Sequence, residues 1–348
     1  MKETLNVGIV GLGRLGKQHA QVLRYRLPQA RLVAAASPVD AERHHAREVL
    51  GVPTVVESLD ALLQVEGLDA VVLVTPTSLH ADQSVQVLEA GKHLFVEKPL
   101  ALNVADCERV AETHERTCKA HPGQVALVGF VRRFDPSYVH ARQAIVDGDV
   151  GVPFYVRSQT CDKLDPSGFF VQFSATSGGI IMDCNIHDID LARWLLSDRE
   201  GHAPRALKVY ASGSCLVHPE LAQFNDVDNA VGTIEFDNGR MASIYASRTF
   251  AHGHETSTEV IATAGKLLVG AGAARDRLVK SDASGVGHVA LGDFFARFQE
   301  AFEHEMQHFV NACLGKEPPA LRLEDATEAT RIGAALTTAL RTGVPQVL

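Results

Sequence analysis

Hydrophobic residues follow two different patterns along the chain. In the first part, short apolar runs alternate with longer stretches whose apolar residues recur at helical spacing. These patterns predict strands over 5–10, 31–36, 69–74, 93–96 and 124–129, with helices over 13–27, 40–50, 78–90 and 103–119. Strands alternating with long helices imply right-handed crossovers, so we expect a doubly wound parallel sheet of the Rossmann type.

The pattern changes after about residue 150. Shorter strands are predicted there over 154–160, 227–236, 240–247 and 259–264, and two closing helices over 293–314 and 324–341. Asp237-Asn238-Gly239 separates two of the strands and is typical of a hairpin turn, because Asn and Gly accept positive φ. We therefore expect an α/β chain whose second domain is α+β, with a largely antiparallel open sheet.

The length of 348 residues suits two domains. We assign 1–130 to a dinucleotide-binding Rossmann domain and 131–348 to a domain for substrate binding and oligomerisation.

A glycine-rich segment follows the first predicted strand and opens a helix, which is the context that gives a G-x-G-x-x-G pattern its meaning. Its glycines allow a tight turn, close approach of a pyrophosphate to the helix N-terminus, and close packing of helix on strand. The residues expected to bind the dinucleotide here are Gly11, Gly13, Arg14, Leu15 and Gly16.

The second strand ends without the acid that commonly binds the adenosine ribose. Ser37 occupies that place, Asp40 and Glu42 are the nearest acids, and Arg43 could instead meet a 2′-phosphate. We favour NAD as the cofactor and leave NADP open.

Two segments carry candidate chemistry. Lys98 precedes Pro99 at the end of a parallel strand, where ligands bind in open α/β sheets, so its ammonium could bind the reacting oxygen. Asp183 and His187 follow two glycines at positions i and i+4 of a predicted helix, and therefore share one face. Histidine is suited to accept an alcohol proton at neutral pH.

Composition and charge exclude several classes of protein. A net charge of −9 gives no basic surface for a phosphate backbone, so we expect no nucleic-acid partner. No apolar run approaches the ~20 residues that span a bilayer, and the six cysteines form no Cys-x-x-Cys pair. We expect a cytoplasmic protein with no membrane association.

A competing motif lies near the C-terminus. His304-Glu305-Met306-Gln307-His308 matches the H-E-x-x-H pattern of zinc proteases. Helical spacing instead predicts an apolar core face on the same helix and turns both histidines away from it. We therefore expect no metal. The residues of that face are Phe295, Phe298, Phe302, Met306 and Phe309.

Taken together, the ordered motifs resemble the glucose–fructose oxidoreductase/inositol dehydrogenase family, and its inositol 2-dehydrogenase-like branch in particular. The resemblance covers the whole chain, and the segments that carry it are 11–16, Thr75-Pro76-Thr77 with His80, Glu97-Lys98-Pro99, 129–135 and 178–188. It implies a catalytic trio of Lys98, Asp183 and His187.

The resemblance also implies binding roles. It places Thr75, Pro76, Glu97 and Lys98 around the nicotinamide and its ribose, and His80 with them among the cofactor-binding residues. It implies that Arg132 reaches substrate hydroxyls together with Lys98, Asp183 and His187. Ser37 departs from the family pattern and is the reason for keeping NADP open.

The expected function is therefore oxidation of a secondary ring hydroxyl of a cyclitol or sugar. His187 would take the alcohol proton as hydride passes to the nicotinamide, Lys98 would stabilise the developing alkoxide, and Asp183 would hold a substrate hydroxyl. Dehydrogenation of an amino sugar or aminoglycoside is the alternative, and a non-catalytic dinucleotide sensor is a remote one. We expect a homodimer or homotetramer.

Overall fold

The computed structural model describes residues 2–270, 272, 274–283 and 285–348, and the chain forms two compact units. The first unit comprises Met1–Val131 and Glu300–Thr330, and the second comprises Arg132–Gln299 and Arg331–Leu348. The first unit's main segment ends at Val131, one residue beyond the 1–130 domain expected from the sequence. Residues 300–330, expected in the second domain, cluster with this unit as well.

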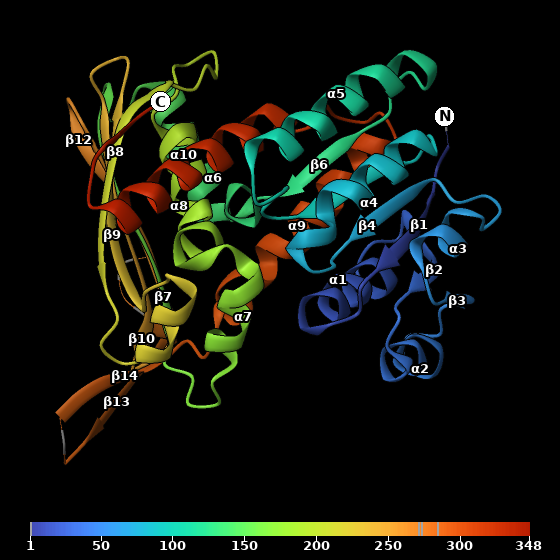
Figure 1. Ribbon diagram of the computed structural model, residues 1–348, viewed down its shortest axis with the longest axis horizontal. Helices are drawn as coiled ribbons and strands as arrows, with labels where there is room; N and C mark the ends of the chain where they lie inside the picture. The colour runs from blue at the N-terminus through green and yellow to red at the C-terminus, as the bar shows by residue number, and fades with distance from the viewer. Residues whose placement is uncertain (1, 271, 273, 284) are drawn as a thin grey trace. The chain divides into compact units, whose positions relative to one another are not determined.

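The first unit contains a six-stranded parallel sheet in the order β3-β2-β1-β4-β5-β6 (Figure 1). This order is that of a dinucleotide-binding Rossmann domain, so the predicted fold of this half is confirmed. The sequence predicted neither the third strand, a half-buried three-residue edge strand, nor the five-residue helix Leu59–Leu63 that follows it. The strands are β1 (Leu5–Val10), β2 (Ala30–Ala36), β3 (Thr54–Val56), β4 (Ala70–Leu73), β5 (His93–Glu97) and β6 (Ala126–Gly129).

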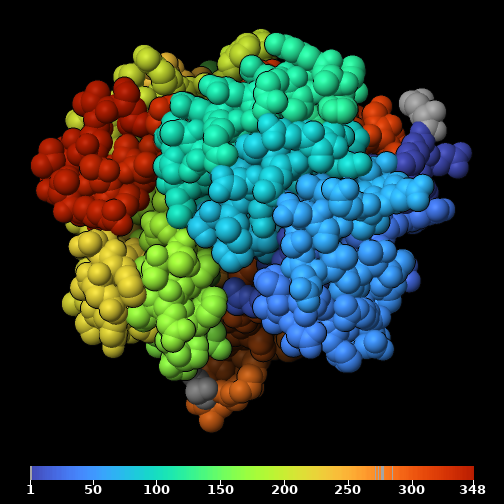
Figure 2. Space-filling view, turned by 45° about the vertical axis from the view of Figure 1, so that its right-hand side comes forward, coloured from blue at the N-terminus to red at the C-terminus, as the bar shows by residue number. Residues whose placement is uncertain are grey.

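Helices connect these strands as crossovers. Two of them have a side-chain N-cap: Ser58 and Asn103 accept hydrogen bonds from backbone N–H groups in the first turns of α3 and α5. Helices α4 and α5 lie side by side on the surface of the unit (Figure 2). The helices are α1 (Arg14–Tyr25), α2 (Asp40–Glu48), α3 (Leu59–Leu63), α4 (Thr77–Glu89) and α5 (Val104–Ala120).

The second unit contains a seven-stranded sheet in the order β12-β11-β7-β10-β9-β8-β15. Its pairings are antiparallel except that of β7 with β10, which confirms the expected largely antiparallel sheet. A separate hairpin, β13–β14, was not predicted, nor were β8, β12 and β15. The strands are β7 (Pro153–Lys163), β8 (Ala206–Ser214), β9 (Asn229–Phe236), β10 (Met241–Phe250), β11 (Glu255–Ala262), β12 (Gly265–Val269), β13 (Ala274–Asp282), β14 (Gly285–Ala290) and β15 (Gln346–Val347).

One face of this sheet is buried and the other is open. Along β9, Ala230, Ile234 and Phe236 are buried whereas Val231 and Thr233 are exposed, as expected for a strand with one solvated face. The unit's helical segments are η1 (Val131–Phe134), α6 (Pro136–Asp147), α7 (Phe169–Ser177), η2 (Ile181–Asn185), α8 (Ile186–Leu195) and η3 (Pro219–Phe224).

Two long helices complete the chain, as predicted, and both contribute to the two units. They are α9 (Phe294–Cys313), which is non-helical at Phe298, and α10 (Leu323–Thr342). The six cysteines are free thiols. Within the described part of the chain, no helix combines the length and apolarity needed to cross a membrane.

Candidate active site

The glycine-rich loop joins β1 to α1 in the first unit. Gly11 has φ +87°, and a Cβ there would lie 2.4 Å from the carbonyl oxygen of Val74. A Cβ on Gly16 would lie 2.0 Å from the carbonyl oxygen of Gly11. Gly13 is the N-cap of α1, whose first turn carries no acidic residue. The loop therefore leaves the positive end of a helix dipole accessible to an anionic pyrophosphate.

A carboxylate from α2 reaches the same loop. Glu42 Oε2 lies 2.6 Å from the Ser37 hydroxyl oxygen and accepts the Leu12 backbone N–H at 3.2 Å. Arg43 is turned towards the backbone, since it donates to the carbonyls of Ser37 and Pro38. Glu42 thus supplies the negative charge that the end of β2 lacks. The sequence indicated Glu42 only as one of two nearby acids.

His80 connects the loops that follow β4 and β5. Its Nδ1 lies 2.8 Å from the Pro99 carbonyl oxygen and its Nε2 lies 2.9 Å from the Thr75 carbonyl oxygen. The ring is 1% exposed, and this burial lowers the pKa of His80. The contacts described for His80 are therefore with backbone rather than with an open surface, and they position Thr75 and Pro99.

Glu97 and Lys98 differ in orientation. Glu97 is buried, with Oε1 2.6 Å from Nε2 of His19 and Oε2 accepting the Lys98 backbone N–H at 3.1 Å. Lys98 is half-buried at the end of β5. Glu97 thus supports the backbone at Lys98, and its expected contact with the nicotinamide stays a prediction.

In the second unit, Asp183 and His187 lie on a helix whose other residues are almost all buried. The helix starts with a π-helical turn, η2, and continues as α8. From Ile180 to Arg193, Asp183 and His187 are the two half-buried side chains and the rest are buried. The pattern predicted the shared face but not the π-helical turn, a feature frequent at functional sites.

The start of this helix is fixed by a carboxylate from further along the chain. Gly179 has φ +87°, and a Cβ there would lie 2.9 Å from Oδ1 of Asp226. The same oxygen accepts the Ile180 backbone N–H at 2.9 Å. Both glycines before the helix, Gly178 and Gly179, have positive φ, which explains the residue type.

Arg248 stands behind Asp183 and was not foreseen from the sequence. It is fully buried, its Nη2 donates to Asp183 Oδ2 at 3.2 Å, and its guanidinium lies 4.9 Å from the centroid of the Phe170 ring. Asp162, on β7, binds His254 at 3.1 Å and accepts from the Cys184 thiol at 3.6 Å. Within this polar network, the fully buried Arg248 binds one oxygen of the half-buried Asp183 carboxylate.

Arg132 has partners other than the expected substrate. It is 3% exposed, its Nη1 donates to Asp188 at 2.9 Å, and its Nη2 donates to the Thr160 hydroxyl at 2.6 Å. Asp188 is fully buried and also accepts from Ser158 and Asn185. Arg132 is therefore part of a buried network next to His187 rather than a group presented to solvent.

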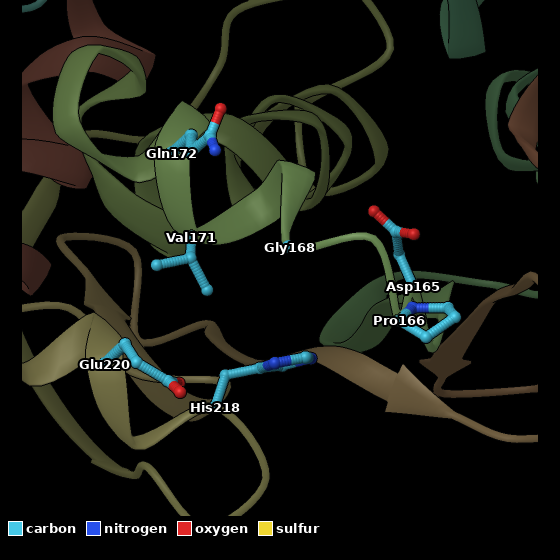
Figure 3. A pocket seen from close by; sticks show the side chains of 7 residues that line it. All are labelled: Asp165, Pro166, Gly168, Val171, Gln172, His218 and Glu220. Carbon is cyan, nitrogen blue, oxygen red and sulfur yellow. The ribbon is translucent and has the colours of Figure 1, made fainter.

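A surface pocket of about 330 Å³ lies elsewhere in the second unit (Figure 3). It contains none of the predicted site residues. The carboxylate of Asp165 is occupied by the N–H and hydroxyl of Ser167, in a local turn. We therefore do not assign the site to this pocket. Its lining residues are Asp165, Pro166, Gly168, Val171, Gln172, His218 and Glu220.

The H-E-x-x-H segment does not gather its histidines around a ligand site. His304 is exposed, and His308 accepts the Ala320 backbone N–H and contacts Glu317. Over the described ranges, the groupings of three potential metal ligands include neither histidine. Glu305, the acid of the motif, is fully buried, which the helical pattern did not predict.

The fold and these residues define a dinucleotide-dependent oxidoreductase. Residues 5–122 match the Gfo/Idh/MocA oxidoreductase family with an NAD-binding Rossmann fold, and residues 138–268 match the family's C-terminal domain. The chain belongs to this family.

Several relatives are similar over nearly their whole length. The chain is 36% identical over 345 residues to scyllo-inositol 2-dehydrogenase (NAD(+)) of Bacillus subtilis, covering 99% of this chain and 96% of the relative. It is 31% identical to myo-inositol 2-dehydrogenase of Thermotoga maritima, covering 94% of each. The crystal structure of Lactobacillus casei scyllo-inositol dehydrogenase with bound NAD(H) and scyllo-inositol has a TM-score of 0.91 and 33% identity, covering 99% of both chains.

Proposed function

We propose that the protein oxidises a secondary ring hydroxyl of an inositol, with NAD as its cofactor. The observation that carries the proposal is the pair of half-buried polar side chains, Asp183 and His187, on an otherwise buried helix. Support comes from relatives whose names specify scyllo-inositol and myo-inositol. The glycine-rich loop and Glu42 fit a dinucleotide with a free ribose hydroxyl.

The proposed mechanism assigns each of three side chains one task. His187 accepts the proton of the substrate hydroxyl, and the Lys98 ammonium stabilises the negative charge that develops on that oxygen. Asp183 accepts a hydrogen bond from a substrate hydroxyl while Arg248 holds its other side. When bound, NAD supplies the acceptor for the hydride that leaves the carbon bearing this hydroxyl, and that carbon becomes a ketone.

The buried residues keep these three groups in place. Glu97 binds the backbone N–H of Lys98, and Asp188 ties the segment that carries His187 to β7. Arg132 acts in this proposal through Asp188, and His80 acts through the Thr75 and Pro99 carbonyls. Positioning of this kind matters because small displacements of reacting groups cost much of the rate.

The test is NADH formation with myo-inositol, scyllo-inositol, glucose and an aminoglycoside, each with NAD and with NADP. We expect turnover of an inositol with NAD. Activity on the aminoglycoside alone would favour the amino-sugar alternative. No turnover of any of the four compounds by a protein that still binds NAD would contradict the proposal and favour a non-catalytic sensor.

Two variants test the roles of the residues. His187→Ala and Lys98→Ala should each lower kcat by about 10²–10⁴-fold, the usual contribution of a proton-transfer group, while NAD binding is retained. His140→Ala, an exposed histidine on α6, is the matched control and should leave kcat unchanged. A kcat near that of the wild type in either active-site variant would remove that residue from the mechanism.

We also infer a homodimer or homotetramer formed through the open face of the second sheet. The strand register places Tyr210, Val231, Met241 and Leu268 on this face, and they are 40%, 53%, 46% and 52% exposed. Exposed apolar patches of this kind mark association surfaces. Light scattering should give a mass two or four times that of the 37.5 kDa chain, and a monomer at micromolar concentration would contradict the inference.

A further inference from the structure

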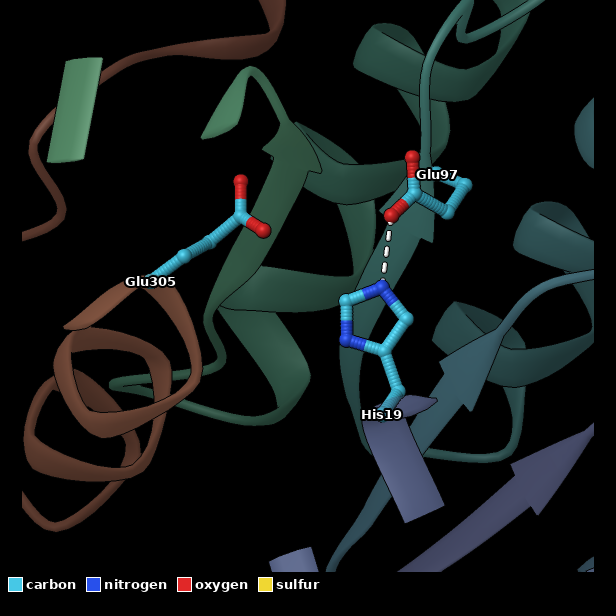
Figure 4. A group of neighbouring side chains, drawn as sticks. All are labelled: His19, Glu97 and Glu305. Atoms are coloured by element: carbon cyan, nitrogen blue, oxygen red, sulfur yellow. Dashed lines mark hydrogen bonds and ion pairs between the residues drawn. The ribbon is translucent and has the colours of Figure 1, made fainter. Parts of the chain in front are cut away.

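A second group of titratable side chains lies in the interior of the Rossmann unit. It consists of His19 on α1, Glu97 on β5 and Glu305 on α9 (Figure 4). Their exposed fractions are 1%, 5% and 0%, and one nitrogen or oxygen of each lies within 4.8 Å of those of the other two.

The contacts of the group are unequal. Glu97 is bound on both sides, by the His19 ring at 2.6 Å and by the Lys98 N–H at 3.1 Å. Neither carboxyl oxygen of Glu305 has a hydrogen-bond partner in the described part of the chain. A buried polar group without a partner is costly, so Glu305 calls for a physical explanation.

The surroundings of the group are aromatic. The His19 ring lies 5.5 Å from the centroids of both Phe95 and Phe302, and Phe95 lies 5.7 Å from Phe309. The titratable groups that face Glu305 are His19 from α1 and Glu97 from β5. Such a setting cannot hold two carboxylates and a neutral imidazole without compensation.

Two protons or one divalent cation would neutralise the two carboxylates, Glu97 and Glu305. The 2.6 Å between His19 Nε2 and Glu97 Oε1 is a hydrogen-bond length. Two ligands of one tetrahedral zinc, with bonds of about 2.0 Å, would stand roughly 3.3 Å apart. The geometry therefore favours protons, one shared by His19 and Glu97 and the other on Glu305. Burial raises the pKa of Glu305 well above its ordinary range, and the charge of Glu97 raises it further.

We infer that Glu305 is a positioning residue that stays protonated and directs its proton to the Glu97 carboxylate through one buried water. Glu97 then accepts from three donors: the His19 ring, the Lys98 backbone N–H and the water held by Glu305. This fixes the backbone at Lys98. The functional part of the inference rests on the proposed role of Lys98, whereas the protonation of Glu305 does not.

The protonation state is tested by stability. The unfolded chain ionises Glu305 near its ordinary pKa of 4.5, whereas the folded chain keeps the proton. Unfolding therefore releases a proton between the two pKa values, and stability falls there as pH rises. Glu305→Gln, which is neutral at every pH, should unfold at a higher temperature than the wild type at neutral pH, and the difference should grow towards alkaline pH.

The exposed Glu300 on the same helix provides the control, and Glu300→Gln should show no such difference. A Glu305→Gln variant that is no more stable than the wild type would overturn the inference. So would one equivalent of bound metal in the purified protein that this variant loses. Neither measurement uses a substrate, so their outcome is independent of the proposed function.

The positioning role is tested by kinetics with the preferred inositol. Glu305→Leu, which cannot donate a hydrogen bond, should lower kcat about ten- to hundredfold with little change in KM, as expected for displacement of a reacting group. Glu305→Gln, which keeps a donor, should restore most of kcat. Equal kcat values for the Leu and Gln variants would refute the positioning role. If the Leu variant does not fold, the stability comparison of the wild type with Glu305→Gln still decides the protonation.

Discussion

Replacing Asp188 by Asn tests whether Arg132 supports the active site or contacts the substrate. Asp188 is fully buried, and its carboxylate accepts from Arg132, Ser158, Thr160 and Asn185 at 2.9, 2.6, 2.7 and 2.8 Å. Asn keeps the shape but removes the charge and turns an amide donor towards groups that are themselves donors. The Arg132 guanidinium would then remain buried without a counter-ion.

The magnitude follows from the burial of the pair. Arg132 and Asp188 side chains are 3% and 0% exposed, so solvent screening does not weaken their interaction. Removing one partner of a buried pair costs about 3–5 kcal/mol, a large share of the roughly 5–15 kcal/mol that stabilises a typical domain. We expect Asp188→Asn and Arg132→Met each to lose stability in this range. The double variant Arg132→Met/Asp188→Leu should lose less than the sum, because neither charge remains.

Urea unfolding followed by circular dichroism measures these losses of stability. The slope of the unfolding free energy against urea concentration should be the same in all variants. A loss below about 1 kcal/mol, the value of an exposed pair, would refute the supporting role. If Arg132 instead binds substrate, Arg132→Met should raise KM while stability stays unchanged. The two interpretations of Arg132 therefore predict opposite combinations of stability and KM.

Three further substitutions address the cofactor site and the second unit. Gly16→Ala should raise the NAD dissociation constant by about tenfold or more in a fluorescence titration, because its Cβ would lie 2.0 Å from the Gly11 carbonyl oxygen. Glu42→Gln should lower the ratio of kcat/KM for NAD to that for NADP by about tenfold, since the carboxylate would no longer repel a 2′-phosphate; an unchanged ratio would remove Glu42 from cofactor selection. Burial opposes ionisation of Asp162, but its hydrogen bond to His254 prevails and lowers the pKa of Asp162. Its stabilisation is thus present above the unfolded pKa and lost as pH falls through the folded pKa, so Asp162→Asn should flatten the acid side of a plot of melting temperature against pH.

The sequence was most informative where a local pattern of residues is compatible with one structure only. Strands buried on both faces are nearly continuous apolar runs, and β4 and β5 were recognised in this way. Gly11 and Gly16 have no space for a Cβ, so their pattern was specific. Helical spacing placed Asp183 and His187 on one face before the structure showed that they are the half-buried pair.

Elements with polar or mixed composition were missed. The buried residues of strand β8, Ala206, Val209 and Ala211, are unevenly spaced, and β12 has one buried residue, so neither gives a strong period-two signal. The π-helical turn in η2 leaves no mark that a 3.6-residue period can detect. Helical spacing likewise gave the core face of α9 through its apolar residues and passed over Glu305, an acid on the buried side.

The interaction partners of the buried charged side chains could not be predicted from the sequence, for a different reason. His19 and Glu97 are 78 positions apart, and Arg132 and Asp188 are 56 positions apart. Periodicity indicates which face of an element is buried, but it does not identify the side chain that meets that face across the fold. For the same reason the sequence did not reveal the buried contacts of Arg132 with Asp188 and of Glu97 with the Lys98 N–H, and the ligand contacts expected of both residues stay predictions.

Both units support their candidate catalytic residue in the same way. Glu97 directly precedes Lys98, and Asp188 directly follows His187, and each of these carboxylates is buried. Each is bound by a basic side chain from a distant segment, His19 in the first unit and Arg132 in the second. A reactive side chain one residue from a fixed carboxylate has its backbone held while its own polar atoms can serve the substrate. Substitutions at His19 or Arg132 should consequently lower kcat although neither is proposed to touch the substrate, and the loss should follow the displacement of the neighbouring backbone rather than a change in substrate affinity.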